Sequence, residues 1–271
     1  YVALATSNLP APAIKDGTAH FQPTLYTGDG SVRNIDQTGN STFQPDMVWI
    51  KNRSATDSHS VFDAILGVTN YWIPDTASVE TTNADSLTSF DSDGFGLGTG
   101  AGGWNDNTED FVAWQWLAGG GAGSSNEEGS INTITTTVNT AAGISISTFT
   151  GNATGGATIG HGLGAAPEFM IAKSTTGGHP NIVYWKNLGG HYGTDMDLLT
   201  APSDLATYWN DVDPTSSLIT LGSGATNTSS VKMLIYAFTS IEGFSKIGSY
   251  TGNGVTDGPV TYTGVKPAYV M

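Results

Sequence analysis

The feature that most constrains the fold is a short phrase that occurs three times in the 271 residues. The phrase consists of an aromatic residue, a threonine, a glycine and an aspartate or asparagine. Its three copies begin at Tyr26, Phe149 and Tyr250. Each phrase is followed by a polar stretch, a proline and an apolar run. The spacing of roughly 100 to 120 residues is a domain length rather than a solenoid period, so the sequence predicts an array of similar modules.

The repeats also predict the order of segments along the chain. We expect a linker at residues 1–25, a β-sandwich module at 26–120, a Gly/Ser-rich linker at 121–130, a second module at 131–247 and the start of a truncated third module at 248–271. Gly/Ser-rich segments are usually flexible. The chain does not start with methionine and ends within a module. We therefore interpret it as the middle piece of a longer polypeptide.

Short runs of β-branched or aromatic residues, separated by Gly, Asn, Asp or Pro, dominate both complete modules. Without strand–helix alternation, such runs predict an all-β fold of tandem antiparallel β-sandwiches, of jelly-roll or immunoglobulin-like type. One short helix per module is expected, around Thr76–Asp85 and Ser203–Trp209. The predicted strands are residues 47–51, 60–64, 87–90, 95–97, 111–117, 131–138, 143–149, 168–173, 181–185, 217–221 and 231–239.

The strand at 111–117 is apolar on nearly both faces. Phe111, Ala113 and Leu117 alternate with Val112, Trp114 and Trp116. This pattern is typical of a strand at the centre of a packed sandwich.

Charge is unusually scarce and mostly negative. Only 12% of residues are charged, and the formal net charge is −15. Nucleic acids and anionic bilayers attract clustered Lys and Arg, so the balance argues against both partners. The chain has no cysteine and no apolar run of membrane-spanning length. Stability must come from core packing or from oligomerisation.

The repeated phrase has the residues of a strand end and a tight turn. We expect the aromatic residue to end an apolar strand and the Gly and Asn/Asp residues to form the turn that follows. We therefore interpret the phrase as the opening hairpin of each module rather than as a binding site. The residues that define these turns are Tyr26, Gly28, Gly30, Phe149, Gly151, Asn152, Tyr250, Gly252 and Gly254.

Metal-ligating patterns are weak. Asp91–Gly94 and Asn105–Asp110 carry oxygen ligands that suit calcium, but neither has the spacing of a full calcium loop. Asp or Asn before Gly is also what a tight turn requires, and we favour that interpretation. No histidine pair has zinc-site spacing. His161 is expected to bond the backbone of a turn, so no metal ligand is assigned.

Catalytic patterns are not found either. The chain contains no Gly-x-Ser-x-Gly elbow, and no Lys-Ser/Thr follows its glycine-rich runs. Nothing selects a carboxylate pair for glycoside cleavage. The sequence therefore predicts a protein that is not an enzyme, with no catalytic residue and no cofactor.

Tryptophan side chains are the remaining candidates for ligand contact, because they can stack on sugars. Trp49, Trp114 and Trp116 lie in predicted strands and are assigned to packing. Trp72 and Trp104 lie near loops rich in Gly and Asn. We expect these two to be exposed and name them as the candidate ligand contacts.

The order of these motifs resembles a tandem module of uncharacterised function that recurs in virion proteins of tailed phages, notably phages of marine bacteria and cyanobacteria. The opening residues 1–10 resemble the linker that follows a SPRY-like or lectin-like sandwich in such proteins, and Leu117 stands where the family often has a basic residue. The resemblance implies no catalytic residue. It is carried by Tyr26–Gly30, Phe43–Arg53, His59–Asp63, Ser86–Phe95, Phe111–Trp116, Ile159–Pro167 and Ser249–Gly254.

The resemblance implies a non-enzymatic structural protein of a phage virion, most simply a tail-fibre segment that spaces or contributes to host-receptor recognition. Its expected location is extracellular, on the tail or the capsid exterior. The expected partners are further copies of the chain (a trimer is the first expectation), other virion proteins and host surface glycans. The alternatives are a capsid decoration or head-fibre protein, a carbohydrate-binding adhesin module and a glycan-degrading tailspike. A tailspike would usually show a β-helix repeat of about 20 residues, which the sequence lacks.

Overall fold

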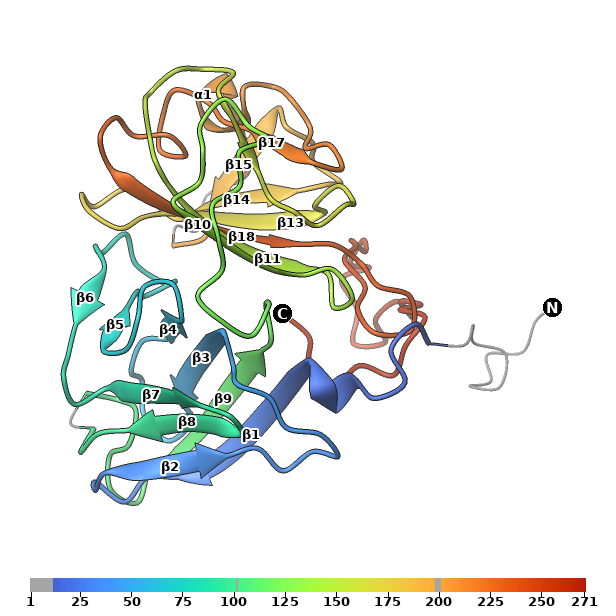
Figure 1. The fold of residues 1–271 in the computed structure, drawn as a ribbon. Coiled ribbons are helices and arrows are strands. Elements are labelled where there is room, and N and C mark those ends of the chain that lie inside the picture. The colour runs from blue at the N-terminus through green and yellow to red at the C-terminus, as the bar shows by residue number, and fades with distance from the viewer. Residues whose placement is uncertain (1–11, 101, 198–200) are drawn as a thin grey trace.

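A computed structural model describes residues 12–100, 102–197 and 201–271, so residues 1–11 of the expected opening linker lie outside the described part of the chain. Two β-rich units, the first coloured blue to green and the second green to orange, are stacked with their large sheets facing each other (Figure 1). Among the described residues, no helix has the length and apolar character needed to cross a membrane.

The first unit is a sandwich of a four-stranded and a three-stranded antiparallel sheet. The 3₁₀ turn η2 (Gly17–Ala19) precedes it, and the short pair β5 (Asn70–Tyr71) and β6 (Thr81–Thr82) lies beside it. In spatial order, the larger sheet consists of β1 (Phe21–Thr27), β9 (Asp110–Trp116), β3 (Met47–Asn52) and β4 (Ser60–Asp63), and the smaller of β2 (Arg33–Asp36), β8 (Gly94–Leu97) and β7 (Leu87–Asp91).

The second unit has a seven-stranded sheet covered by a two-stranded one. The single α-helix of the described residues, α1 (Ala206–Trp209), lies on the same side as the small sheet. In spatial order, the larger sheet consists of β10 (Thr135–Asn139), β11 (Ile144–Thr150), β18 (Lys232–Phe238), β13 (Phe169–Ser174), β14 (Ile182–Trp185), β15 (Tyr192–Asp195) and β16 (Ser203–Asp204), and the smaller of β12 (Thr158–Gly160) and β17 (Leu218–Thr220).

The two units share one topology. The order β1-β9-β3-β4 recurs as β11-β18-β13-β14, and the pair β2-β8 recurs as β12-β17. Every strand pair in both units is antiparallel. The prediction of an all-β fold of antiparallel sandwiches is confirmed. The recurrence also shows that four strands of the large sheet and two of the small sheet repeat, in addition to the phrase that opens each unit.

Each unit has its own core, and a third core lies between the units. One cluster fills the first sandwich around Phe62, Phe95 and Phe111, and another fills the second around Tyr184 and Trp209. The third contains side chains of β3 and β4 together with side chains of β11, β13, β14 and β18. Its fully buried members include Val61, Trp72, Ile146, Leu234 and Tyr236.

The shared core explains why the central strands are apolar on both faces. In β18, Met233 and Ile235 point into the second sandwich, whereas Leu234 and Tyr236 point into the core between the units. In β9, Phe111 packs inside the first sandwich and Trp114 packs against the shared core. Both large sheets are therefore covered on both sides, and this burial stabilises the two units against separation.

Of the two expected helices, one is wrong and the other is shorter than expected. Within Thr76–Asp85, residues Thr81–Thr82 form β6 and pair with β5, and the backbone N–H of Glu80 donates to Thr175 O of the second unit. These hydrogen bonds hold the segment extended, so the expected helix does not form. In the range 203–209, only α1 is helical, and Ser203–Asp204 is a strand.

The Gly/Ser-rich connection is anchored rather than flexible at its start. The Asp46 carboxylate accepts hydrogen bonds from the backbone N–H groups of Ala118 at 2.6 Å, Gly120 at 2.8 Å and Gly121 at 3.2 Å. Ser124 then forms a backbone bridge with Thr136. The path from the first unit to the second is thereby fixed.

Candidate functional site

The first copy of the phrase is a turn closed by a buried asparagine. Tyr26 lies at the end of β1, where its hydroxyl donates to Trp104 O at 2.7 Å. Gly28 donates from its backbone N–H to Glu109 O, and Gly30 donates to Asn105 O with a left-handed φ of 67°. The side chain of Asn105, which is fully buried, accepts from the Asp29 N–H at 3.2 Å.

The second copy repeats this geometry. Phe149 is buried near the end of β11, and Gly151 donates to Val231 O. The fully buried Asn227 takes the place of Asn105, because its side-chain oxygen accepts from the Asn152 N–H at 2.9 Å and its backbone oxygen accepts from Ala153. The turn-closing roles of Asn105 and Asn227 are not predicted from the sequence. Their equivalent distance from each phrase, 76 and 75 residues, was the available signal.

The third copy has no such environment. Tyr250 is 72% exposed, and a Cβ added at Gly252 or Gly254 would meet nothing within 4 Å. At Gly28 and Gly151, by contrast, an added Cβ would lie 2.2 Å from a backbone oxygen, of Asp106 and Thr228 respectively. Residues 248–271 contain no strand. The phrase forms the expected turn only where a complete unit surrounds it.

The expected exposure of Trp72 and Trp104 is wrong. Trp104 is 2% exposed and packs against Tyr71 and Phe62 in the core of the first unit. Trp72 is 1% exposed and belongs to the core between the units. Both side chains come from loops, but each loop folds back over a sheet. Neither indole can stack on a sugar in this arrangement.

A buried polar network joins the two units at Trp72. Its indole N–H donates to the Tyr236 hydroxyl at 2.8 Å, and this hydroxyl donates to the Asp63 carboxylate at 2.5 Å. The backbone N–H groups of Ile65 and Leu66 also donate to Asp63. Burial raises the pKa of Asp63 to about 6, although these hydrogen bonds favour its charged form. Residues from both units must be in place to satisfy this network.

The segment that follows Trp72 crosses onto the second unit. The Asn181 amide donates to Pro74 O at 3.1 Å and to Thr76 O at 2.9 Å. The buried Lys173 ammonium donates to Ser78 O at 2.5 Å. Burial lowers the pKa of Lys173 to about 8. These bonds add to the apolar contacts that hold the units together.

An apolar cavity of about 340 Å³ lies at the junction of the units and the C-terminal segment. Trp49 and Trp114 contribute rings at 88° to each other, and the Trp49 indole donates to His59 Nδ1 at 2.9 Å. Burial lowers the pKa of His59. Pro74, Asp75, Met196 of the second unit and Tyr269–Met271 complete the wall. Its polar groups are few, which suits an apolar side chain better than a charged ligand.

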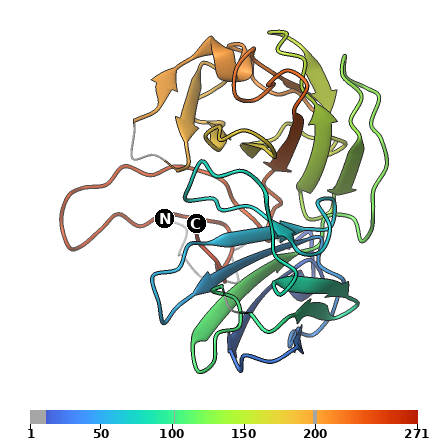
Figure 2. The same ribbon diagram turned by 90° about the vertical axis from the view of Figure 1, so that its left-hand side faces the viewer.

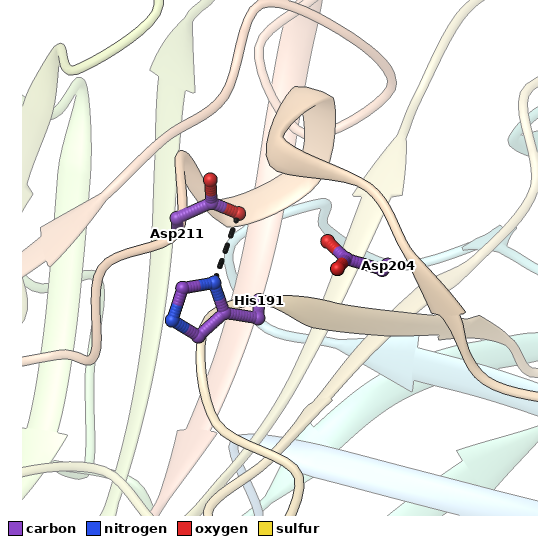
Figure 3. A group of neighbouring side chains, drawn as sticks. All are labelled: His191, Asp204 and Asp211. Carbon is purple, nitrogen blue, oxygen red and sulfur yellow. Dashed lines mark ion pairs between the residues drawn. The ribbon is translucent and has the colours of Figure 1, made fainter.

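Two groups of side chains have metal-ligand chemistry. In the first, His191, Asp204 and Asp211 have ligand atoms within 4.8 Å of one another (Figure 3). All three are exposed, and His191 Nδ1 already forms an ion pair with Asp211 at 3.4 Å. Imidazole and carboxylate groups can bind divalent metals, but this ion pair by itself accounts for the approach of His191 and Asp211.

The second group consists of Asp57, Asp106 and Glu109. The side-chain amide of Asn52 donates to both Asp57 and Glu109, and the backbone N–H of Gly103 donates to Asp106 at 2.8 Å. Each of these carboxylates thus accepts a hydrogen bond from a neutral donor. Asp106 and Glu109 of the Asn105–Asp110 segment thus lie close to a third acidic residue, Asp57. Asp91–Gly94 forms the hairpin between β7 and β8, as the turn interpretation predicts.

His161 has the structural role that its sequence context predicts. It is fully buried, and its Nδ1 accepts from the Leu163 N–H at 3.2 Å. Its Nε2 therefore carries the proton and donates to Thr215 O at 3.2 Å. Burial lowers the pKa of His161, so the ring is held neutral between two backbone groups.

The comparison with protein families extends over nearly the whole chain. The family described as "Domain of unknown function (DUF7483)" matches residues 16–271. The chain belongs to this family. A single DUF7483 match covers both units and the C-terminal segment, so the family domain contains the two stacked units together. Searches of the curated proteins and of the solved structures give no match.

Proposed function

We propose that the chain is a non-enzymatic structural segment of a phage virion, in a tail fibre, that holds neighbouring parts of the fibre at a fixed distance and angle. The observation that carries this proposal is the core shared by the two units, in which fully buried side chains of both large sheets pack together. A spacer must resist bending between its modules. Modules joined by a flexible linker alone would not do so.

Further support comes from the resemblance of the sequence to virion modules and from the surface chemistry. Only 12% of residues are charged. Contacts made through Ser, Thr and Asn depend little on salt, which suits an exterior protein in seawater. Trp72 and Trp104, the two tryptophans expected to stack on glycans, are buried and cannot do so. The proposal therefore assigns the chain to spacing rather than to sugar recognition.

Localisation on purified particles tests the proposal. An antibody raised against the chain should label the tail fibres of the phage that encodes it, and cryo-electron microscopy should show the two units at a constant mutual angle. Labelling of the capsid would support the capsid-decoration alternative instead. A particle without the chain, or depolymerase activity of the chain on host polysaccharide, would contradict the proposal.

A further inference from the structure

Asp204 and Asp211 flank α1, which lies on the side of the second unit that is turned away from the first unit (Figures 1 and 2). Strand pairing brings Asp204 next to His191. Tyr192, the first residue of β15, pairs with Asp204 at the end of β16, and the Leu205 N–H donates to His191 O at 3.0 Å. The side chains of Asp204 and His191 therefore start from backbone positions that the sheet fixes.

Asp211 reaches His191 from the other end of α1. Asn210 and Asp211 have left-handed φ values of 54° and 57°, and these turn the chain back after the helix. A Cβ added at Gly190 would lie 2.4 Å from the Val212 backbone, so the segments before β15 and after α1 are in close contact. The backbone thus positions all three members of the cluster before any attraction between their side chains acts.

The position of the Asp204 carboxylate is not explained by the ion pair between His191 and Asp211. Two carboxylates at short range repel each other. Figure 3 nevertheless shows all three side chains pointing toward one another, with their ligand atoms within 4.8 Å. Among the described residues, the Asp204 carboxylate takes part in no hydrogen bond and no ion pair. In the other acidic group, by contrast, each carboxylate accepts a hydrogen bond from a neutral donor. A bound cation would neutralise the carboxylates of this cluster.

The spacing of the ligand atoms suits a zinc ion. Two ligand atoms bound to one tetrahedral zinc ion lie about 3.4 Å apart, because each bond to the metal is about 2.1 Å long. His191 Nδ1 and Asp211 Oδ1 are 3.4 Å apart. A rotation of the exposed Asp204 side chain can close the remaining gap, since its ligand oxygen already lies within 4.8 Å of both. Imidazole nitrogen and carboxylate oxygen are both common zinc ligands.

We propose that His191, Asp204 and Asp211 bind one divalent transition-metal ion, with zinc as the best match. Three protein ligands leave the fourth tetrahedral position to water, because all three side chains are exposed to solvent. The imidazole selects against calcium and magnesium, which prefer a larger set of oxygen ligands. The inference goes beyond the proposed function, because it depends on these three side chains and not on the location of the chain in a virion.

Isothermal titration calorimetry of the metal-free full chain with zinc chloride tests the site. The wild-type chain should bind a single zinc ion, and calcium should bind at least about tenfold more weakly. His191→Gln, Asp204→Asn and Asp211→Asn should each weaken zinc binding at least about tenfold, since even the loss of a group that only orients a metal ligand costs that much. His179→Gln and Asp93→Asn lie outside the cluster and are the matched controls, which should bind like the wild type. No zinc binding by the wild type, or unchanged zinc binding by Asp204→Asn, would overturn the inference.

Thermal unfolding separates metal binding from a structural role of the carboxylates. A ligand that binds only the folded chain raises its melting temperature. Excess zinc should therefore raise the melting temperature of the wild-type chain but not that of Asp204→Asn, and a chelator should reverse the shift. The far-ultraviolet circular dichroism of each metal-free variant checks that it is folded. An equal zinc-induced shift in the two chains would place the ion elsewhere and refute the site.

Discussion

Replacement of Tyr236 by phenylalanine tests how strongly the two units depend on each other. The change keeps the ring, which lies 5.6 Å from Trp72 between centroids, and removes only the hydroxyl. Two buried groups then lose a partner, the Trp72 indole N–H and one oxygen of Asp63. Each buried unsatisfied group costs about 1–3 kcal/mol, and Asp63 keeps its two backbone donors. We expect a loss of about 3 kcal/mol in the free energy of unfolding at pH 7.

Urea unfolding followed by tryptophan fluorescence measures this loss, and an unchanged m-value would show that the unfolded state is the same. Tyr184→Phe is the matched control. Tyr184 lies in β14, and its hydroxyl donates to Asp213 at 3.1 Å. That variant should lose no more than about 1 kcal/mol. If Tyr236→Phe unfolds within about 0.5 kcal/mol of the wild type, or like Tyr184→Phe, the network does not join the units as described.

The remaining predictions concern the repeated phrase and the buried acid. Gly28→Ala and Gly151→Ala should each lower the free energy of unfolding by at least about 2 kcal/mol, because the new Cβ meets a backbone oxygen, whereas Gly252→Ala should change it by less than about 0.5 kcal/mol. Equal effects in thermal unfolding would show that the phrase has no structural role. The pKa of Asp63 is raised to about 6 from 3.8, so the folded state binds the proton of this carboxyl group more tightly than the unfolded state does. Protonation therefore adds up to about 3 kcal/mol to the free energy of unfolding below pH 3.8, and this contribution is lost as the pH rises through about 6. Asp63→Asn should remove this part of the pH dependence of the free energy of unfolding, and the exposed control Asp93→Asn should keep it. The same pH dependence in Asp63→Asn and in the wild type would contradict the raised pKa of Asp63.

Local pattern was enough to predict most strands and the fold class. The predicted ranges 47–51 and 143–149 lie almost entirely on β3 and β11, because β-branched and aromatic runs bounded by turn residues have few other stable conformations. The strand β1 was missed since Pro23 interrupts it. Proline is tolerated there because β1 is the edge of its sheet, a fact that depends on tertiary structure.

The burial of the tryptophans could not be predicted from their neighbours. Glycine and asparagine around Trp72 indicate a loop, and loops are usually exposed. What buries Trp72 is Tyr236, which is 164 residues away along the chain and belongs to the other unit. The same holds for Asn105, whose role depends on a turn more than 70 residues earlier. Contacts of such sequence separation leave no periodic signal. The alignment of the two repeats could have revealed the role of Asn105, which recurs at Asn227, but not the contact of Trp72 with Tyr236, which joins the units.

Differential scanning calorimetry tests the central claim, that the shared core makes the two units unfold as one cooperative unit. Units that unfold together give a single transition whose calorimetric enthalpy equals the van't Hoff enthalpy. The structure predicts one such transition for the wild-type chain, and a downward shift of the same single transition for Tyr236→Phe. Two resolved transitions in the wild type, or a calorimetric enthalpy about twice the van't Hoff value, would show that the units unfold independently and would contradict the claim.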